Sequence, residues 1–143
     1  MIIATSKPKS FKIGAELIKF YQGGTEFSHI LIIKNDLVFQ ASNGYVNCSH
    51  IENFLDDNVI VNIYSIPDEA VDMPFIKKQL GKKYGKDQVF KIALKFITGI
   101  RLRSNGNQRF ICSELVGKAL KLDWVDDYTS PKELIEYIRK TYG

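Results

Sequence analysis

The spacing of apolar and polar residues predicts strands in the first half of the chain and helices mainly in the second. Runs rich in β-branched residues predict strands at 1–5, 29–33, 37–41 and 59–66. Apolar residues at helical spacing predict helices at 11–21, 73–80, 86–98, 112–120 and 131–141. This order is typical of an α+β domain whose helices pack on one face of a mainly antiparallel sheet.

Two helix starts carry capping signals. Ser49 and Glu52 have the spacing of a capping box, which predicts a short helix beginning at "SHIENFL". Ser130 and Glu133 form a second such pair, with Pro131 in the first turn of the last helix. Both signals predict helices that begin at the serine.

Length and composition indicate one globular domain. The chain has 143 residues, of which 45% are apolar and 25% charged, and these values are typical of a single domain with one core. No internal repeat, low-complexity segment or linker interrupts it. We therefore expect one domain spanning residues 1–143.

The net charge of +4 comes from lysines that are denser between residues 77 and 103. Such a basic surface is either a solvated face or a weak contact for an anionic surface. No aromatic-interleaved motif of a nucleic-acid reader is present, so we expect no specific nucleic-acid partner. "MIIATSKPKS" has no signal-peptide core, and lysines interrupt "VFKIALKFITGI". We therefore expect no transmembrane segment and a cytoplasmic location.

The cysteines and histidines argue against metal and disulfide frameworks. Cys48 and Cys112 lie far apart, and the two histidines, His29 and His50, form no CxxC or HxxxH pair. We therefore expect no metal site and no cofactor. Cys48 and His50 stand together in "CSH", which we interpret as a solvated turn at the start of a helix.

Cys112 begins the apolar face of a predicted helix in "RFICSELVGKAL". One interpretation is structural, because free cysteine is commonly buried and behaves there as a small hydrophobe. The other is chemical, because the N–H groups and dipole of a helix N-terminus stabilise a thiolate and lower the thiol pKa. The pattern leaves both interpretations open.

His29 and Gln40 belong to the two strands of a predicted hairpin. Asn35 and Asp36 tolerate turn conformations, and a turn there brings Gln40 near His29 across the ladder. A side-chain amide in that place can hold the second nitrogen of the imidazole. The alternatives are a structural histidine at a strand end and a solvent-facing glutamine.

Four segments in order carry a family resemblance: "FSHILII", "LVFQAS", "GKKYG" and "FICSELVGKAL". Together they resemble the circularly permuted, YiiX-like branch of the NlpC superfamily of papain-like cysteine hydrolases. In that branch the histidine strand precedes the cysteine helix. The resemblance covers most of the chain and implies a permuted papain-like fold.

The resemblance also implies roles for individual residues. Cys112 would be the nucleophile, His29 the general base and acid, and Gln40 the third polar residue. Tyr84 would contact the oxyanion or line the cleft, and its alternative is a loop aromatic that covers the core. Glu114 would either tune the site or brace its helix.

The implied activity is a thiol hydrolase that cleaves an amide or ester bond through a cysteine acyl-enzyme. The implied substrates are a peptide, a peptidoglycan-like polymer or an acyl lipid. One alternative is a lipid-directed acyltransferase or thioesterase of the same fold. Another is a non-enzymatic binding module in which Cys112 is inert.

Overall fold

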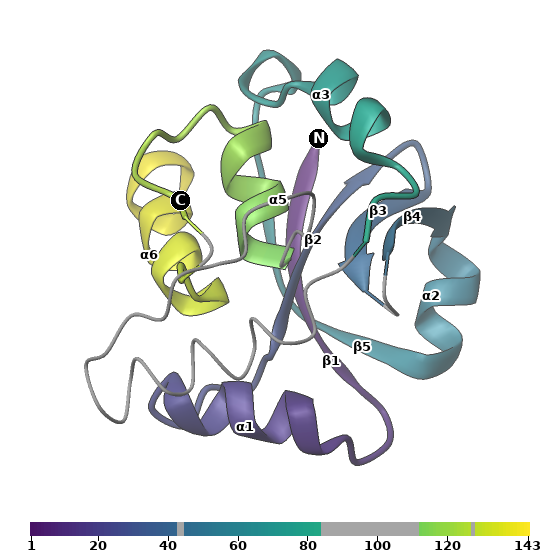
Figure 1. Ribbon diagram of the computed structural model, residues 1–143, viewed down its shortest axis with the longest axis vertical. Coiled ribbons are helices and arrows are strands. Elements are labelled where there is room, and N and C mark those ends of the chain that lie inside the picture. The colour runs from purple at the N-terminus through teal and green to yellow at the C-terminus, as the bar shows by residue number, and fades with distance from the viewer. Residues whose placement is uncertain (43–44, 84–111, 127) are drawn as a thin grey trace.

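The computed structural model describes residues 1–42, 45–83, 112–126 and 128–143 (Figure 1). The strands are β1 (Ile2–Pro8), β2 (His29–Lys34), β3 (Leu37–Ser42), β4 (Tyr45–His50) and β5 (Asn58–Ser65). The helices are α1 (Ile13–Tyr21), α2 (Ile51–Asp57), α3 (Met73–Gln79), α5 (Cys112–Ala119) and α6 (Pro131–Tyr142), with a short 3₁₀ turn, η1 (Asp68–Ala70). The predicted helix at 86–98 lies outside the described residues. The fold is α+β, as the sequence predicts.

The five strands form one sheet in the order β4-β3-β2-β1-β5, and every neighbouring pair is antiparallel. β1 comes first in the sequence but lies between β2 and β5 (Figure 1). The prediction of a mainly antiparallel sheet is confirmed.

The hairpin of β2 and β3 turns where the sequence predicts. Asn35 and Asp36 have φ angles of 49° and 62°, the left-handed conformation that two-residue hairpin turns require and that Asn and Asp tolerate. The registered pairs of this ladder run from Lys34–Leu37 to Ile32–Phe39. The beginning of β2, from His29, extends beyond the last registered pair.

The sequence patterns miss β4 and misplace the start of α2. Ser49 lies in β4, where it pairs with Val38, and α2 begins at Ile51 with His50 at the N-cap and no side-chain capping bond. The predicted Ser49–Glu52 capping box is therefore wrong, because the ladder with β3 places Ser49 before the helix. The Ser130–Glu133 box is confirmed, since each side chain bonds the other residue's backbone N–H.

Helices cover both faces of the sheet, so the prediction of helices on one face is wrong. On one face α5 and α6 pack on Ile3, Ile30, Ile32 and Phe39. On the other face Phe54 of α2 packs on Ala4, Leu31 and Val38. The physical reason is the alternation of side chains in the central strands, which are apolar on both faces.

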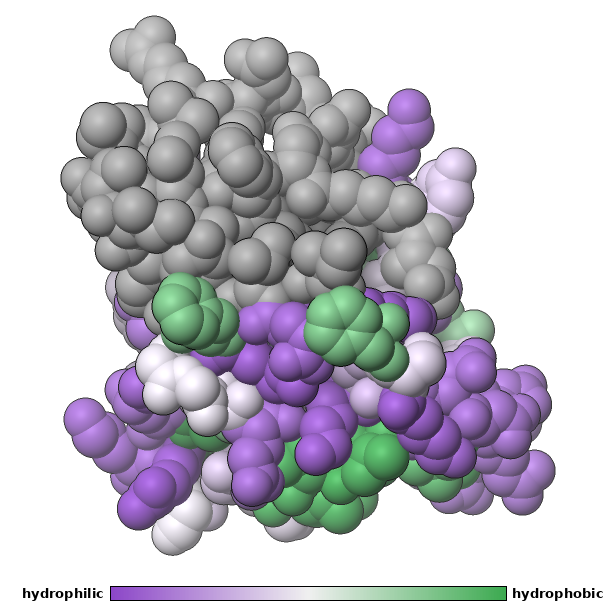
Figure 2. All heavy atoms as spheres, turned by 90° about the horizontal axis from the view of Figure 1, so that it is seen from below, coloured by the Kyte–Doolittle hydropathy of each residue, from purple (hydrophilic) through white to green (hydrophobic). Residues whose placement is uncertain are grey.

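Seen from the side of α1, the coloured part of the surface is mainly hydrophilic, with hydrophobic residues exposed among the polar ones (Figure 2). Phe11 and Phe20 are the most exposed of the large hydrophobic side chains described, at 77% and 74%. Single exposed apolar residues are common on protein surfaces. Among the helices of the described ranges, none has the length and apolarity needed to cross a bilayer.

Candidate functional site

His29 and Gln40 are hydrogen-bonded to each other. His29 is the first residue of β2, and its Nε2 lies 2.8 Å from Oε1 of Gln40 on β3. An amide oxygen can only accept a hydrogen bond, so Nε2 carries the hydrogen. In the neutral ring Nδ1 then keeps its lone pair, and Gln40 selects the tautomer in which Nδ1 can act as a base.

The two residues meet diagonally rather than directly across the hairpin. The register of the pair Ile32–Phe39 places Gln40 opposite Leu31, two residues after His29. Diagonal neighbours in a ladder lie within reach of long side chains. The predicted proximity of Gln40 to His29 is confirmed, and the hydrogen bond spans the part of the hairpin beyond the last registered pair.

Cys112 lies far from His29 and Gln40 in the sequence, but its helix packs on the two strands that carry them. It is the first residue of α5, which packs on β2 and β3. Its sulfur receives a hydrogen bond from the backbone of Ile30. The N–H group of Ile30 belongs to the peptide bond that joins His29 to Ile30, so the thiol lies at the backbone of the residue that carries the imidazole.

Burial dominates the electrostatics of this site. It raises the pKa of the Cys112 thiol to about 11, against hydrogen bonds from the backbone of Ile30, Ser113 and Cys112 itself that lower it. Burial also lowers the pKa of His29 to about 4, against the hydrogen bond to Gln40 that raises it. At neutral pH the site therefore holds a protonated thiol and a neutral imidazole.

The expectation that the helix N-terminus lowers the pKa of Cys112 is wrong for this conformation. The backbone N–H groups do lower it, but removal from water has the larger effect on a side chain that is only 4% exposed. Cys112 also packs with Val116, Ala119 and Leu120 in the main core. It is therefore both the first residue of a buried stripe and a thiol at the helix N-terminus that contacts the backbone of Ile30.

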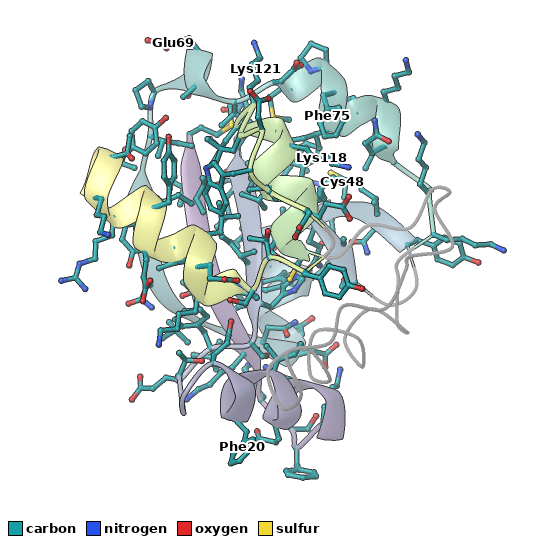
Figure 3. The ribbon with its side chains drawn as sticks, turned by 60° about the vertical axis from the view of Figure 1, so that its left-hand side comes forward. Phe20, Cys48, Glu69, Phe75, Lys118 and Lys121 are labelled. Carbon is teal, nitrogen blue, oxygen red and sulfur yellow. The ribbon has the colours of Figure 1, made fainter. Side chains whose placement is uncertain are left out.

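Glu114 faces a partner on its own helix. Its side chain is buried, and Oε1 lies 2.6 Å from Nζ of Lys118, one turn further along α5. Lys118 projects from α5 in Figure 3. This ion pair supports the interpretation of Glu114 as a brace for the helix. Tyr84 lies outside the described residues.

Cys48 and His50 lie two residues apart on β4, and both are exposed. Cys48 is labelled on this strand in Figure 3. The predicted surface position of this pair is confirmed, but the predicted turn is wrong because both residues pair with β3, Cys48 with Phe39 and His50 with Leu37. Cys48 and His50 therefore take no part in the hydrogen bond between His29 and Gln40.

One residue beside the site was missed by the sequence patterns. Ser6 of β1 is the register partner of His29 and is 0% exposed. It lies just beyond the apolar run at 1–5, and no local motif links it to His29. Only the pairing of β1 with β2 reveals the relationship.

We compared the chain with protein-family models and with curated proteins, and neither comparison found a match. The family resemblance carried by the four sequence segments therefore remains a prediction.

Proposed function

We propose that this chain is a papain-like thiol hydrolase that forms an acyl-enzyme on Cys112. The observation that carries the proposal is the His29–Gln40 hydrogen bond of 2.8 Å, which orients a basic Nδ1 on the residue whose peptide bond contacts the Cys112 sulfur. A thiol, a base and a group that orients the base are the three parts such catalysis needs.

In the proposed reaction the Cys112 sulfur attacks the carbonyl carbon of an amide or ester, and its proton passes to Nδ1 of His29. Because the resting thiol and imidazole are both neutral, proton transfer accompanies the attack and no ion pair precedes it. Backbone N–H groups at the start of α5 stabilise the oxyanion. His29 then protonates the leaving group, and water hydrolyses the thioester to restore the thiol.

The proposal includes a permuted papain-like fold, since the strand of His29 precedes the helix of Cys112. Its substrates are acyl compounds with an amide or ester bond, namely a peptide, a peptidoglycan-like polymer or an acyl lipid, and its location is the cytoplasm. A lipid-directed acyltransferase or thioesterase would use the same acyl-enzyme and differ in the group that accepts the acyl chain.

A non-enzymatic binding module is the second candidate. It is favoured by the burial of Cys112, which is 4% exposed and has a raised pKa. A thiol that stays buried and protonated is inert toward acyl groups. The two candidates differ in whether Cys112 reacts while the protein is folded.

The test is acylation by p-nitrophenyl acetate, followed by intact-mass measurement and peptide mapping in a Cys48→Ser background. We expect acetylation of Cys112 in the folded protein, its loss in His29→Ala and its retention in the matched control His50→Ala. Release of acetate into water would indicate a hydrolase, and release only to an added amine or alcohol a transferase. If Cys112 stays unmodified in the folded protein and is acetylated only in denaturant, the hydrolase proposal fails. The binding module is then the remaining candidate.

A further inference from the structure

Ser6 carries a buried hydroxyl group whose role the fold alone does not explain. The residue is 0% exposed, and among the described residues its Oγ has no hydrogen-bond partner. A buried polar atom without a partner destabilises the folded state relative to an apolar group of the same shape. Such atoms are rare in proteins and are often found where a functional group needs them.

Ser6 lies directly across the ladder from His29. Side chains of opposed residues project from the same face, with Cβ atoms roughly 4.5–5.5 Å apart. β1 and β3 flank β2 on its two sides, so His29 has Ser6 on one side and Gln40 on the other. The backbone carbonyl of Ser6 also accepts a hydrogen bond of 3.1 Å from the N–H of Ser28, the residue before His29.

We propose that Ser6 is a positioning residue for His29, and that its hydroxyl oxygen turns toward the imidazole when the ring takes the proton of Cys112. This inference rests on the proposed thiol chemistry. In the resting state Gln40 satisfies the ring at Nε2, and the Ser6 hydroxyl stays without a partner. In the protonated state the ring is positive, and the hydroxyl dipole stabilises it in a half-buried site.

The surroundings of His29 make a neutral dipole significant. Two effects set the pKa of the imidazole: burial lowers it, and the hydrogen bond to Gln40 raises it. The neighbours that the strands give it are Ser6 across the ladder with β1 and Gln40 on β3, and neither of these side chains titrates. A protonated ring therefore depends on hydroxyl and amide dipoles, since no charged side chain of the described residues contributes to its pKa.

The experiment compares Ser6→Ala with Ser28→Ala, a matched control that removes another buried serine hydroxyl next to His29. Three quantities are measured in the Cys48→Ser background: the pKa of His29 by NMR, the rate of Cys112 alkylation by iodoacetamide against pH, and the melting temperature. For Ser6→Ala we expect a lower His29 pKa, alkylation slower by roughly threefold to tenfold, and an unchanged or higher melting temperature. Ser28→Ala should leave the pKa and the rate unchanged.

Ser6→Thr keeps the hydroxyl and should restore the His29 pKa toward its original value. An unchanged pKa and rate in Ser6→Ala would overturn the inference, and so would unfolding of Ser6→Ala, because the hydroxyl would then be structural. The failure of the proposed function is distinguishable: Cys112 would stay unlabelled in the parent protein at every pH at which it is folded, while the NMR comparison would still report on Ser6.

Discussion

Oε1 of Gln40 lies 2.8 Å from Nε2 of His29, although the ladder places Leu31, not His29, opposite Gln40. The contact joins two strands of one hairpin at the position where their registered pairing has ended. It depends on a neutral amide, which accepts from the ring without adding a charge. The tautomer of His29 and the protonation of its ring are therefore both sensitive to residue 40.

Substitutions at residue 40 should separate these two effects. Gln40→Leu removes the acceptor, so we expect a mixture of imidazole tautomers, a lower His29 pKa and Cys112 alkylation slower by roughly tenfold. Gln40→Glu places a carboxylate beside the ring and should raise the His29 pKa. Nitrogen-15 NMR of the imidazole reports tautomer and pKa together. Identical ring spectra in the parent protein and in Gln40→Leu would contradict the assigned hydrogen bond.

Stability should fall in mild acid because of His29. Its pKa is lowered from 6.5 to about 4 in the folded protein, so the unfolded chain binds the proton more tightly. The contribution of the neutral ring is complete above pH 6.5 and is lost as the pH falls toward 4, by at most about 3 kcal/mol. Urea unfolding at pH 7, 6, 5 and 4 measures this loss.

The control for this prediction is His29→Gln, which replaces the imidazole at residue 29 with a side chain that does not titrate. Its free energy of unfolding should change less between pH 6.5 and 4 than that of the parent protein. His50→Gln serves as the matched variant, because it removes a histidine that lies on the surface. Parallel curves for the parent and for His29→Gln would show that His29 is not buried as a neutral ring.

The reactivity of Cys112 should increase at high pH instead of reaching a plateau near neutrality. Burial raises its pKa to about 11 from 9.0, so the thiolate is a minor species until the pH approaches that value. Alkylation of Cys48→Ser by iodoacetamide should therefore accelerate continuously from pH 7 through 9. A rate that is already maximal at pH 7 would show a preformed ion pair and a more open site than this conformation has.

The same shift predicts a loss of stability in alkali. The unfolded thiol releases its proton from about pH 9 upward while the folded thiol keeps it until about pH 11, so stability falls as the pH rises between these values. Cys112→Ala in the Cys48→Ser background removes this dependence and serves as the matched control.

Gly117 of α5 packs directly against Val125. A Cβ atom at residue 117 would lie 2.6 Å from both γ carbons of Val125, which is itself buried. Although alanine favours helix more than glycine does, we expect Gly117→Ala to destabilise the fold by about 1–3 kcal/mol. Urea unfolding measures the change.

A double-mutant cycle tests the cause of that loss. If the clash with Val125 is responsible, Val125→Ala should make the substitution Gly117→Ala less costly than it is alone, with a coupling of about 1 kcal/mol. Additive effects of the two substitutions would place the cause elsewhere in α5. A Gly117→Ala protein that is more stable than its parent would show that helix propensity outweighs the contact.

Local patterns in the sequence predicted the elements whose signals lie within a few residues. The hairpin of β2 and β3 follows from β-rich runs around Asn35 and Asp36, and the start of α6 follows from Ser130 and Glu133. The contact of His29 with Gln40 was predictable for the same reason, since a two-residue turn sets the register of a hairpin.

Contacts between residues far apart in the sequence determined the rest of the fold and of the candidate site. β4 has few buried side chains and no strong strand pattern, so its ladder with β3 became visible only in the sheet. The place of β1 beside β2, which brings Ser6 to His29, joins residues far apart in the sequence. The pKa of Cys112 was likewise beyond the sequence, because the helix N-terminus is a local feature whereas burial depends on how α5 packs on the sheet. Local sequence patterns thus determined the hairpin, its turn and the residue types available for chemistry. Tertiary packing determined which of these residues meet and in which protonation state they do so.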